Sequence, residues 1–180
     1  MSPEPTEPIQ YAHLPDNIIV IRVLGKGTHL QSPSLRYVFD QTRDAAPPPR
    51  YIIDLDRCTT MDSTFMGTLA SIGLHQVERT GSRVIVTNIQ EHVLRLLNTL
   101  GLKYILDLRA NHDQTVNRLG LGEEAFTPAA GPRLDKLDRI VLMIEAHERL
   151  IDVDSQNEVK FQGVLRTLRQ SLDEEQQRPS

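Results

Sequence analysis

Cysteine and aromatic residues are scarce in this 180-residue chain, and each scarcity excludes a class of structure. Cysteine occurs once, as Cys58, so the chain can form neither an internal disulfide nor a cysteine-based zinc site. Trp is absent and aromatic residues make up only 4% of the chain, which leaves the core to aliphatic side chains. A chain of this kind is suited to a reducing compartment.

An excess of basic charge and a long apolar run are also missing. The 20 Lys and Arg residues against 24 Asp and Glu give a formal net charge of -4, so no broad positive field attracts nucleic acid or anionic lipid. The longest apolar stretches, such as 17–24, are far shorter than the roughly 20 residues of a membrane-spanning helix. Residues 1–8 have neither the basic nor the apolar region of a signal peptide. We expect a cytoplasmic protein without direct nucleic-acid binding or membrane insertion.

Strand and helix patterns alternate between residues 17 and 112, which we take as the folded domain after a disordered tail at 1–16. β-Branched runs predict strands, and apolar residues at helical spacing predict helices. The expected strands are 18–24, 51–55, 84–86 and 104–108, and the expected helices begin near Ser32, Ser63 and Ile89, the last with Asn88 as its N-cap. This alternation predicts an α/β fold, with a small sheet and helices packed against it.

The remainder of the chain predicts a linker and a helical extension. Residues 113–131 are polar and rich in glycine, as is typical of a linker. Residues 132–177 carry two helical stripes with a turn between them, which predicts a C-terminal helical hairpin. Two helices with such narrow apolar faces are seldom stable alone in water. We expect the hairpin to dock on the α/β domain or to pair with a second copy as a homodimer.

Standard catalytic and cofactor patterns are not met. The segment Gly25-Lys26-Gly27 lacks the hydroxyl that a phosphate loop needs directly after its lysine, so it is expected to be a turn. The histidines have no metal-binding spacing, and His92 and His147 are expected to be solvated on helix surfaces. Cys58 is expected to be a small buried hydrophobe. No metal and no cofactor is predicted.

Three carboxylates permit a different interpretation. Asp54, Asp56 and Asp62 follow or flank an expected strand end, where acids can gather to bind Mg²⁺ and accept phosphate. The alternative is that they are charged residues beside a strand and a helix start. A small hydrolase using Asp54 and Asp62 is the weakest hypothesis, because no base, nucleophile and oxyanion site can be assembled. We therefore predict that the protein is not an enzyme.

The most informative segment is 59–69, where a strand and loop run into a helix. Asp62 or Ser63 can cap that helix by accepting from a free backbone N–H. Gly67 and Gly73 each cost about 1 kcal/mol relative to alanine inside a helix, which indicates that another element approaches closely. Phe65 adds an apolar side chain beside the main stripe, which favours a partner surface.

The same segment carries a family resemblance. The run Asp62-Ser63-Thr64-Phe65-Met66-Gly67-Thr68-Leu69, with Leu24-Gly25, Ile52-Ile53-Asp54-Leu55 and Asn98-Thr99-Leu100-Gly101-Leu102 around it, resembles the STAS domain of bacterial anti-sigma factor antagonists. The resemblance covers residues 17–108. Phe65 departs from the glycine usual at its position, and Thr28 stands where many members carry an aspartate.

The resemblance implies a non-enzymatic partner-switching regulator of transcription. It implies that Ser63 is the residue phosphorylated by a partner serine kinase and that Asp62 is its docking neighbour. Thr64 is a second hydroxyl, and with Phe65 and Met66 it completes the expected partner-binding set. The expected partners are a kinase, an anti-sigma factor or a related regulatory protein. The alternative is a STAS-fold scaffold or a transporter or signalling-complex subunit without a phosphorylation cycle.

Overall fold

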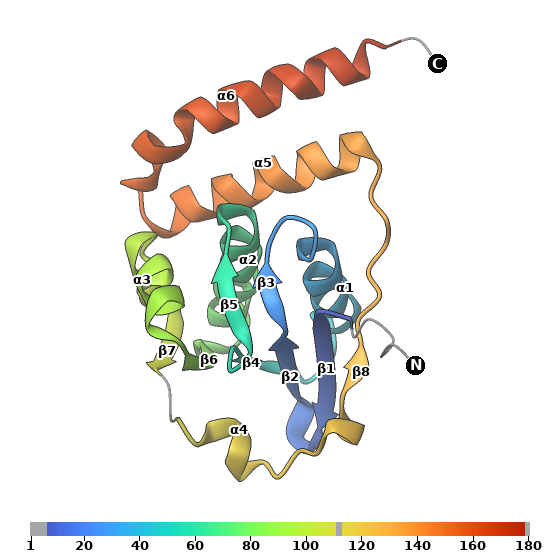
Figure 1. The fold of residues 1–180 in the computed structure, drawn as a ribbon, viewed down its shortest axis with the longest axis vertical. Coiled ribbons are helices and arrows are strands. Elements are labelled where there is room, and N and C mark those ends of the chain that lie inside the picture. The colour runs from blue at the N-terminus through green and yellow to red at the C-terminus, as the bar shows by residue number, and fades with distance from the viewer. Residues whose placement is uncertain (1–6, 111–112, 179–180) are drawn as a thin grey trace.

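The computed structural model describes residues 7–110 and 113–178, which form an α/β domain crowned by two long helices (Figure 1). The strands are β1 Ile9–Leu14, β2 Ile18–Val23, β3 Gly25–Gly27, β4 Arg50–Asp54, β5 Cys58–Met61, β6 Val84–Ile89, β7 Leu106–Ala110 and β8 Thr127–Pro128. The α-helices are α1 Ser32–Thr42, α2 Ser63–Thr80, α3 Glu91–Thr99, α4 Thr115–Arg118, α5 Lys136–Val153 and α6 Asn157–Gln176. The expected α/β class with a C-terminal helical pair is confirmed.

The main sheet has the strand order β7-β6-β4-β2-β1-β8. Strands β2, β4, β6 and β7 run parallel, whereas β1 pairs antiparallel with both β2 and β8. Residues 9–14, which the sequence analysis assigned to a disordered tail, therefore form a strand inside the sheet. The tail prediction failed there because the short alternation Ile9, Tyr11, His13 is a weak signal without its partner strand. Residues 1–6 of that predicted tail lie outside the described residues.

The two faces of the sheet are covered differently. Because side chains alternate along a strand, Ile19 and Ile21 of β2 belong to the core cluster that includes residues of α1, α2 and α3, whereas Val20 faces the other way. On that second face Val20 packs with Val116 and Phe126 from the segment 113–126. The expected linker is thus partly a covering layer, and it ends in β8 at the edge of the sheet.

The segment expected as a turn at 25–27 is strand β3, which pairs in parallel with β5 in a separate two-stranded sheet. The backbone N–H of Asp62 donates to the Gly27 carbonyl at 2.9 Å, so this small sheet leads directly into α2. Sequence patterns missed it because a three-residue strand is set by its partner and not by its own periodicity. Its effect is to fix where α2 begins.

Asn88 does not cap α3. Strand β6 continues through Ile89, Asn88 has a positive φ of 58°, and the helix begins after Gln90. The Asn88 amide instead donates to Oδ1 of the buried Asp54 at 2.9 Å. The Asn88 side chain therefore binds Asp54, which is distant in sequence, instead of capping α3 as the local sequence predicted.

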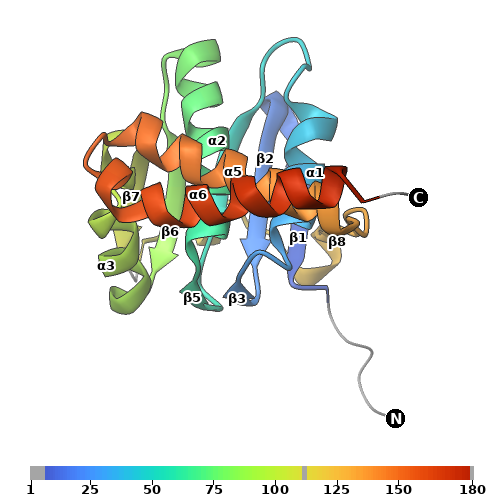
Figure 2. The ribbon, with the colours of Figure 1, turned by 90° about the horizontal axis from the view of Figure 1, so that it is seen from above.

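The C-terminal hairpin docks on the domain of its own chain. Helix α5 packs across α2, and α6 lies along α5 on the side away from the sheet (Figures 1 and 2). The Oδ1 of Asp135 accepts from the Asp138 N–H at 2.8 Å and so caps α5. Of the two alternatives expected for the hairpin, docking within the chain is the one that this structure contains. No helix among the described residues is long and apolar enough to cross a membrane.

Candidate functional site at the start of α2

Asp62 organises the start of α2. One carboxylate oxygen accepts from the Phe65 N–H at 2.9 Å, which satisfies a free donor of the first turn. The other accepts from the His29 N–H at 2.8 Å and so holds the loop after β3 against the helix. Asp62 is the N-cap, one of the two residues that the sequence analysis proposed for that role.

Ser63 is the first residue of α2, and its side chain is partly buried against α5. Its Oγ lies 2.9 Å from Nε2 of His147, and Nδ1 of the same ring lies 2.7 Å from the Met143 carbonyl. A carbonyl oxygen can only accept, so Nδ1 carries a proton and donates to it. In the tautomer that has this ring proton alone, Nε2 is an acceptor and the Ser63 hydroxyl donates to His147.

His147 is the residue of the site that sequence reasoning missed. It was expected to be solvated, yet it is only 3% exposed, and its ring packs edge-on against Phe161 with 4.9 Å between centroids. The buried positions Ile140, Ile144, His147 and Leu150 follow helical spacing, so a place on the apolar stripe was the available signal. His92, by contrast, is exposed as expected.

The close approach predicted from Gly67 is made by α5. A Cβ at Gly67 would overlap the carbonyl of Ala146 and lie 2.7 Å from the Ala146 Cα, so only glycine allows the two backbones to meet here. Beside this crossing, Arg36 of α1 forms an ion pair with Glu145 of α5. The element that approaches α2 belongs to the same chain.

Thr64, Phe65 and Met66 were expected to contact a partner, but all three are buried, with exposed fractions of 3%, 0% and 5%. The Phe65 ring occupies the space where a Cβ of Gly27 would stand, at 2.7 Å from Cδ1. Phe65 therefore belongs to the core, with Gly27 making room for it. None of the three is accessible to a partner while the hairpin is docked as in this structure.

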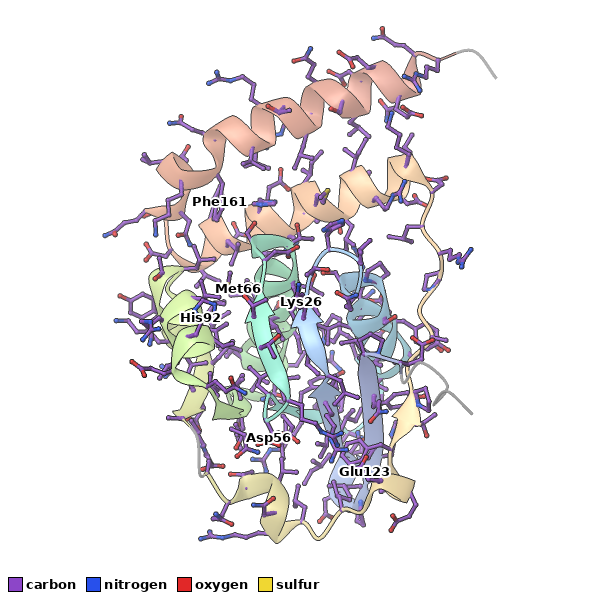
Figure 3. The ribbon with its side chains drawn as sticks, in the orientation of Figure 1. Lys26, Asp56, Met66, His92, Glu123 and Phe161 are labelled. Carbon is purple, nitrogen blue, oxygen red and sulfur yellow. The ribbon has the colours of Figure 1, made fainter. Side chains whose placement is uncertain are left out.

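The hairpin is fastened to the domain at several further points. Leu150 and Phe161 belong to the main hydrophobic core. The fully buried amide of Asn157 donates to the Leu100 and Leu150 carbonyls at 3.0 and 2.7 Å, and Lys160 Nζ donates to the Thr99 carbonyl at 2.8 Å. Figure 3 labels Phe161 of α6 and Met66 of α2. Docking thus combines apolar burial with specific hydrogen bonds.

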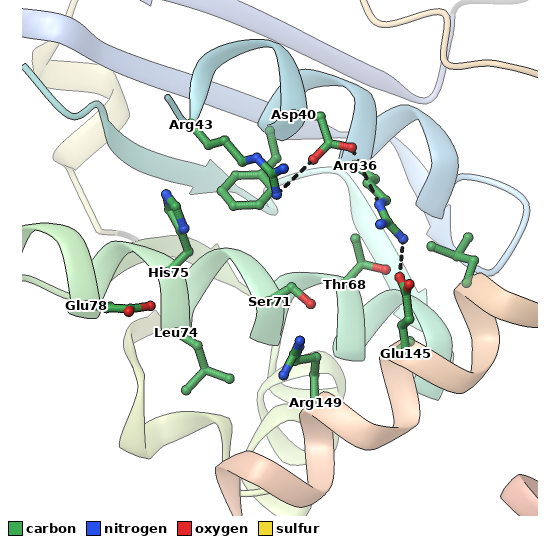
Figure 4. A pocket seen from close by; sticks show the side chains of 13 residues that line it. Arg36, Asp40, Arg43, Thr68, Ser71, Leu74, His75, Glu78, Glu145 and Arg149 are labelled. Atoms are coloured by element: carbon green, nitrogen blue, oxygen red, sulfur yellow. Dashed lines mark hydrogen bonds and ion pairs between the residues drawn. The ribbon is translucent and has the colours of Figure 1, made fainter. Parts of the chain in front are cut away.

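A cavity of about 370 Å³ lies between α1, α2 and α5, next to the crossing at Gly67 (Figure 4). Three arginines and three carboxylates line it, and several of them are paired: Asp40 contacts Arg36 at 3.5 Å and Arg43 at 3.4 Å, and Arg36 also contacts Glu145. Since the positive and negative charges of the lining are equal in number, the cavity has little net attraction for an anion.

Of the three carboxylates considered as a Mg²⁺ site, Asp54 and Asp56 line one cavity, but Asp62 does not join them. Asp54 is 4% exposed and lies 3.6 Å from Nε of Arg22, whose guanidinium also binds Glu123. Asp56 lies with Glu123 at the end of the molecule away from the hairpin (Figure 3), whereas Asp62 caps α2. Among the residues that the structure describes, no group of three or more His, Cys, Asp or Glu is placed to hold a metal ion. Asp54 is best explained by its ion pair.

Cys58 is fully buried in the core, and its burial raises the pKa of the thiol from 9.0 to about 11. The expectation of a small buried cysteine is confirmed. The Lys26 side chain of β3 is exposed.

Comparison with known proteins identifies the fold. A family model described as the STAS domain matches residues 11–115. A protein from Thermotoga maritima described as an anti-sigma factor antagonist is similar with a TM-score of 0.50 and 15% identity, covering 62% of this chain and 93% of its own. The anti-sigma factor antagonist SpoIIAA in its unphosphorylated form has a TM-score of 0.49 and 18% identity, and the match covers 62% of this chain and 97% of SpoIIAA. A sulfate transporter family protein from Wolinella succinogenes has a TM-score of 0.48 and 17% identity, and the match covers 59% of this chain and 88% of that protein. At these identities the solved structures indicate the fold alone, and α5 and α6 lie outside the residues that the family model matches.

Proposed function

Because the chain belongs to the STAS-domain family, we propose that it is a non-enzymatic partner-switching regulator, of the anti-sigma factor antagonist kind, whose switch is phosphorylation of Ser63. In this proposal it acts in the cytoplasm, binds a serine kinase, an anti-sigma factor or a related regulator, and changes partner when phosphorylated. The observation that supports it best is the position of Ser63 as the first residue of a helix whose N-cap is Asp62.

A phosphate is tolerated electrostatically at that position. It adds about -1.5 to -2 charge at a helix N-terminus, where free N–H groups and the helix dipole favour an anion. Helix α2 therefore needs little refolding on modification, and the effect is exerted on its neighbours. At about 5 Å from a partner carboxylate this charge costs roughly 1.5 kcal/mol even in a water-like dielectric. Such a cost weakens binding by about tenfold.

The proposal is tested by phosphorylation in extract of the native cells. Wild type, Ser63→Ala and the control Ser71→Ala, a second partly buried serine on α2, are incubated with extract and labelled ATP, and the site is mapped by mass spectrometry. The proposal expects labelling of wild type and Ser71→Ala and its loss in Ser63→Ala. Equal labelling of all three, or none, contradicts it.

A second candidate function is a STAS-fold scaffold without a phosphorylation cycle. It is favoured by the hydrogen bond that already engages the Ser63 hydroxyl and by the burial of Thr64, Phe65 and Met66 under the chain's own elements. This candidate predicts that partner capture is the same for wild type, Ser63→Ala and Ser63→Asp. A partner that binds wild type and is lost from Ser63→Asp excludes it.

A further inference from the structure

The surface of α2 that carries Ser63 is already occupied. Helix α5 lies on it, and its His147 accepts the hydrogen bond of the Ser63 hydroxyl. We infer that α5 is a built-in cover of this site: the hairpin must leave α2 before another protein can reach Ser63, and phosphorylated Ser63 disfavours its return. The part of this inference that concerns phosphate rests on the proposed function, whereas the covering itself does not.

The closeness of the crossing leaves no room for a second protein. At Gly67 the α5 backbone lies where a side chain on α2 would begin. His147 and Ala146, which face this part of α2, are each only 3% exposed. A kinase that must place its active site around Ser63 therefore competes with α5 for the same surface.

The chemistry of the hydrogen bond makes the competition reciprocal. Phosphoryl transfer from ATP forms the Oγ–P bond, releases ADP and gives up the Ser63 hydroxyl proton to the kinase's base or to solvent. Oγ then has no hydrogen to donate, and Nε2 of the buried His147 loses its donor. The added negative charge also lies at the α5 contact. By linkage, phosphate on Ser63 and docking of α5 disfavour each other by the same free energy at equilibrium.

The cover is closed in the unmodified chain because α5 is held near its middle and at its C-terminal end. Arg36 pairs with Glu145 near the middle of α5, and Leu150 and Asn157 fix its end and the turn that follows. Opening therefore needs a partner that binds the exposed surface more tightly than α5 does, and phosphate on Ser63 then disfavours closing.

Accessibility of position 63 is measured with a thiol probe. Ser63→Cys reports opening through its rate of reaction with a charged disulfide reagent, and wild type is the blank because Cys58 is fully buried. Gly67→Ala, which forces α5 away from α2, should raise that rate by roughly tenfold or more. The control Gly163→Ala adds the same methyl group to α6, where apart from the adjacent helix backbone it would meet nothing within 4 Å, and it should leave the labelling rate unchanged.

A second variant acts from the other side of the crossing. Ala146→Leu adds bulk on α5 and leaves the α/β domain untouched, so it gives the same answer if Gly67→Ala does not fold, as checked by circular dichroism. The inference is overturned if both variants fold and label no faster than Ser63→Cys alone. It is also overturned if Ser63→Cys alone already reacts as fast as a free thiol.

Hydrogen exchange tests the effect of charge at Ser63. Ser63→Asp removes the donor and adds a carboxylate, so amides of 136–153 should exchange roughly tenfold faster than in wild type. Ser82→Asp, the same change at an exposed residue, should not alter them. Unchanged exchange in Ser63→Asp overturns the reciprocal part of the inference. Failure of the extract assay at Ser63 with a positive thiol result removes the proposed function and leaves the cover standing.

Discussion

The hydroxyl of Ser63 donates to Nε2 of His147 at 2.9 Å, across 84 positions of the sequence. One partner is the first residue of the helix that carries the STAS motif, and the other lies on a helix outside the residues matched by that family. The extension is thus joined to the domain at the proposed switch itself. This relationship connects stability, accessibility and regulation, and each can be measured.

Removal of the buried imidazole should destabilise the protein. His147→Ala leaves a cavity and an unpaired Ser63 hydroxyl, so we expect a loss of about 2–4 kcal/mol in the free energy of unfolding, measured in urea. The exposed His92→Ala is the control and should change it by less than about 0.5 kcal/mol. A double-mutant cycle with Ser63→Ala should give a coupling of about 1 kcal/mol. Equal effects of the two histidine variants contradict the assignment.

Gly27 and Phe65 should behave as a coupled pair. Gly27→Ala places a methyl group against the Phe65 ring and is expected to cost about 1–3 kcal/mol by overpacking. Phe65→Leu in the Gly27→Ala background should recover part of that loss, although Phe65→Leu alone is destabilising. Lys26→Ala, an exposed position in the same strand, is the control. Strictly additive losses in thermal or urea unfolding would show that the ring does not need the glycine.

Stability should fall in alkaline solution partly through Cys58. The folded thiol has its pKa raised from 9.0 to about 11 by burial, so the unfolded chain loses its proton first as the pH rises. The stabilisation is complete below about pH 9 and is lost as the pH rises through about 11, and the total loss of stability is roughly 3 kcal/mol. Urea unfolding at several pH values should show that the free energy of unfolding declines less steeply with pH in Cys58→Ala than in wild type. Parallel pH profiles of stability for wild type and Cys58→Ala would contradict this. Burial also raises the pKa of Tyr51 to about 12, so the stability of both proteins should still decline above pH 10.

Asn157 should hold the hairpin turn in place. Asn157→Ala leaves the Leu100 carbonyl without this donor and removes one of the donors to the Leu150 carbonyl, at a cost of about 1–3 kcal/mol. We expect faster hydrogen exchange in 157–176 with little change in the sheet. Gln156→Ala, at the exposed neighbouring position, is the control. Slow exchange of α6 in Asn157→Ala would assign the turn to apolar packing alone.

Local sequence patterns predicted most of the domain because its helices and central strands are periodic. The cost of Gly67 inside a helix correctly indicated a close neighbour, although it could not say that α5 of the same chain was that neighbour. Strand β1 and the strand pair β3 and β5 were missed, because their pairing depends on residues distant in sequence. Asn88 was assigned to a helix cap by a local rule that a long-range bond to Asp54 overrides.

The candidate site was half visible in the sequence. Asp62 and Ser63 could be placed at a helix start from local chemistry alone. The partner of Ser63 could not, since a histidine on an amphipathic helix is equally compatible with a solvated or a buried position until the docking of that helix is known. Phe65 was interpreted as partner surface because only the folded chain shows the space that Gly27 leaves for it.

The most direct measurement of the central claim is site-localised mass spectrometry of the protein purified from its native cells. The account predicts a fraction of molecules phosphorylated at Ser63, with faster hydrogen exchange of α5 in that fraction than in the unmodified one. Phosphate confined to other residues, or a modified fraction whose α5 exchanges as slowly as the unmodified protein, would contradict it.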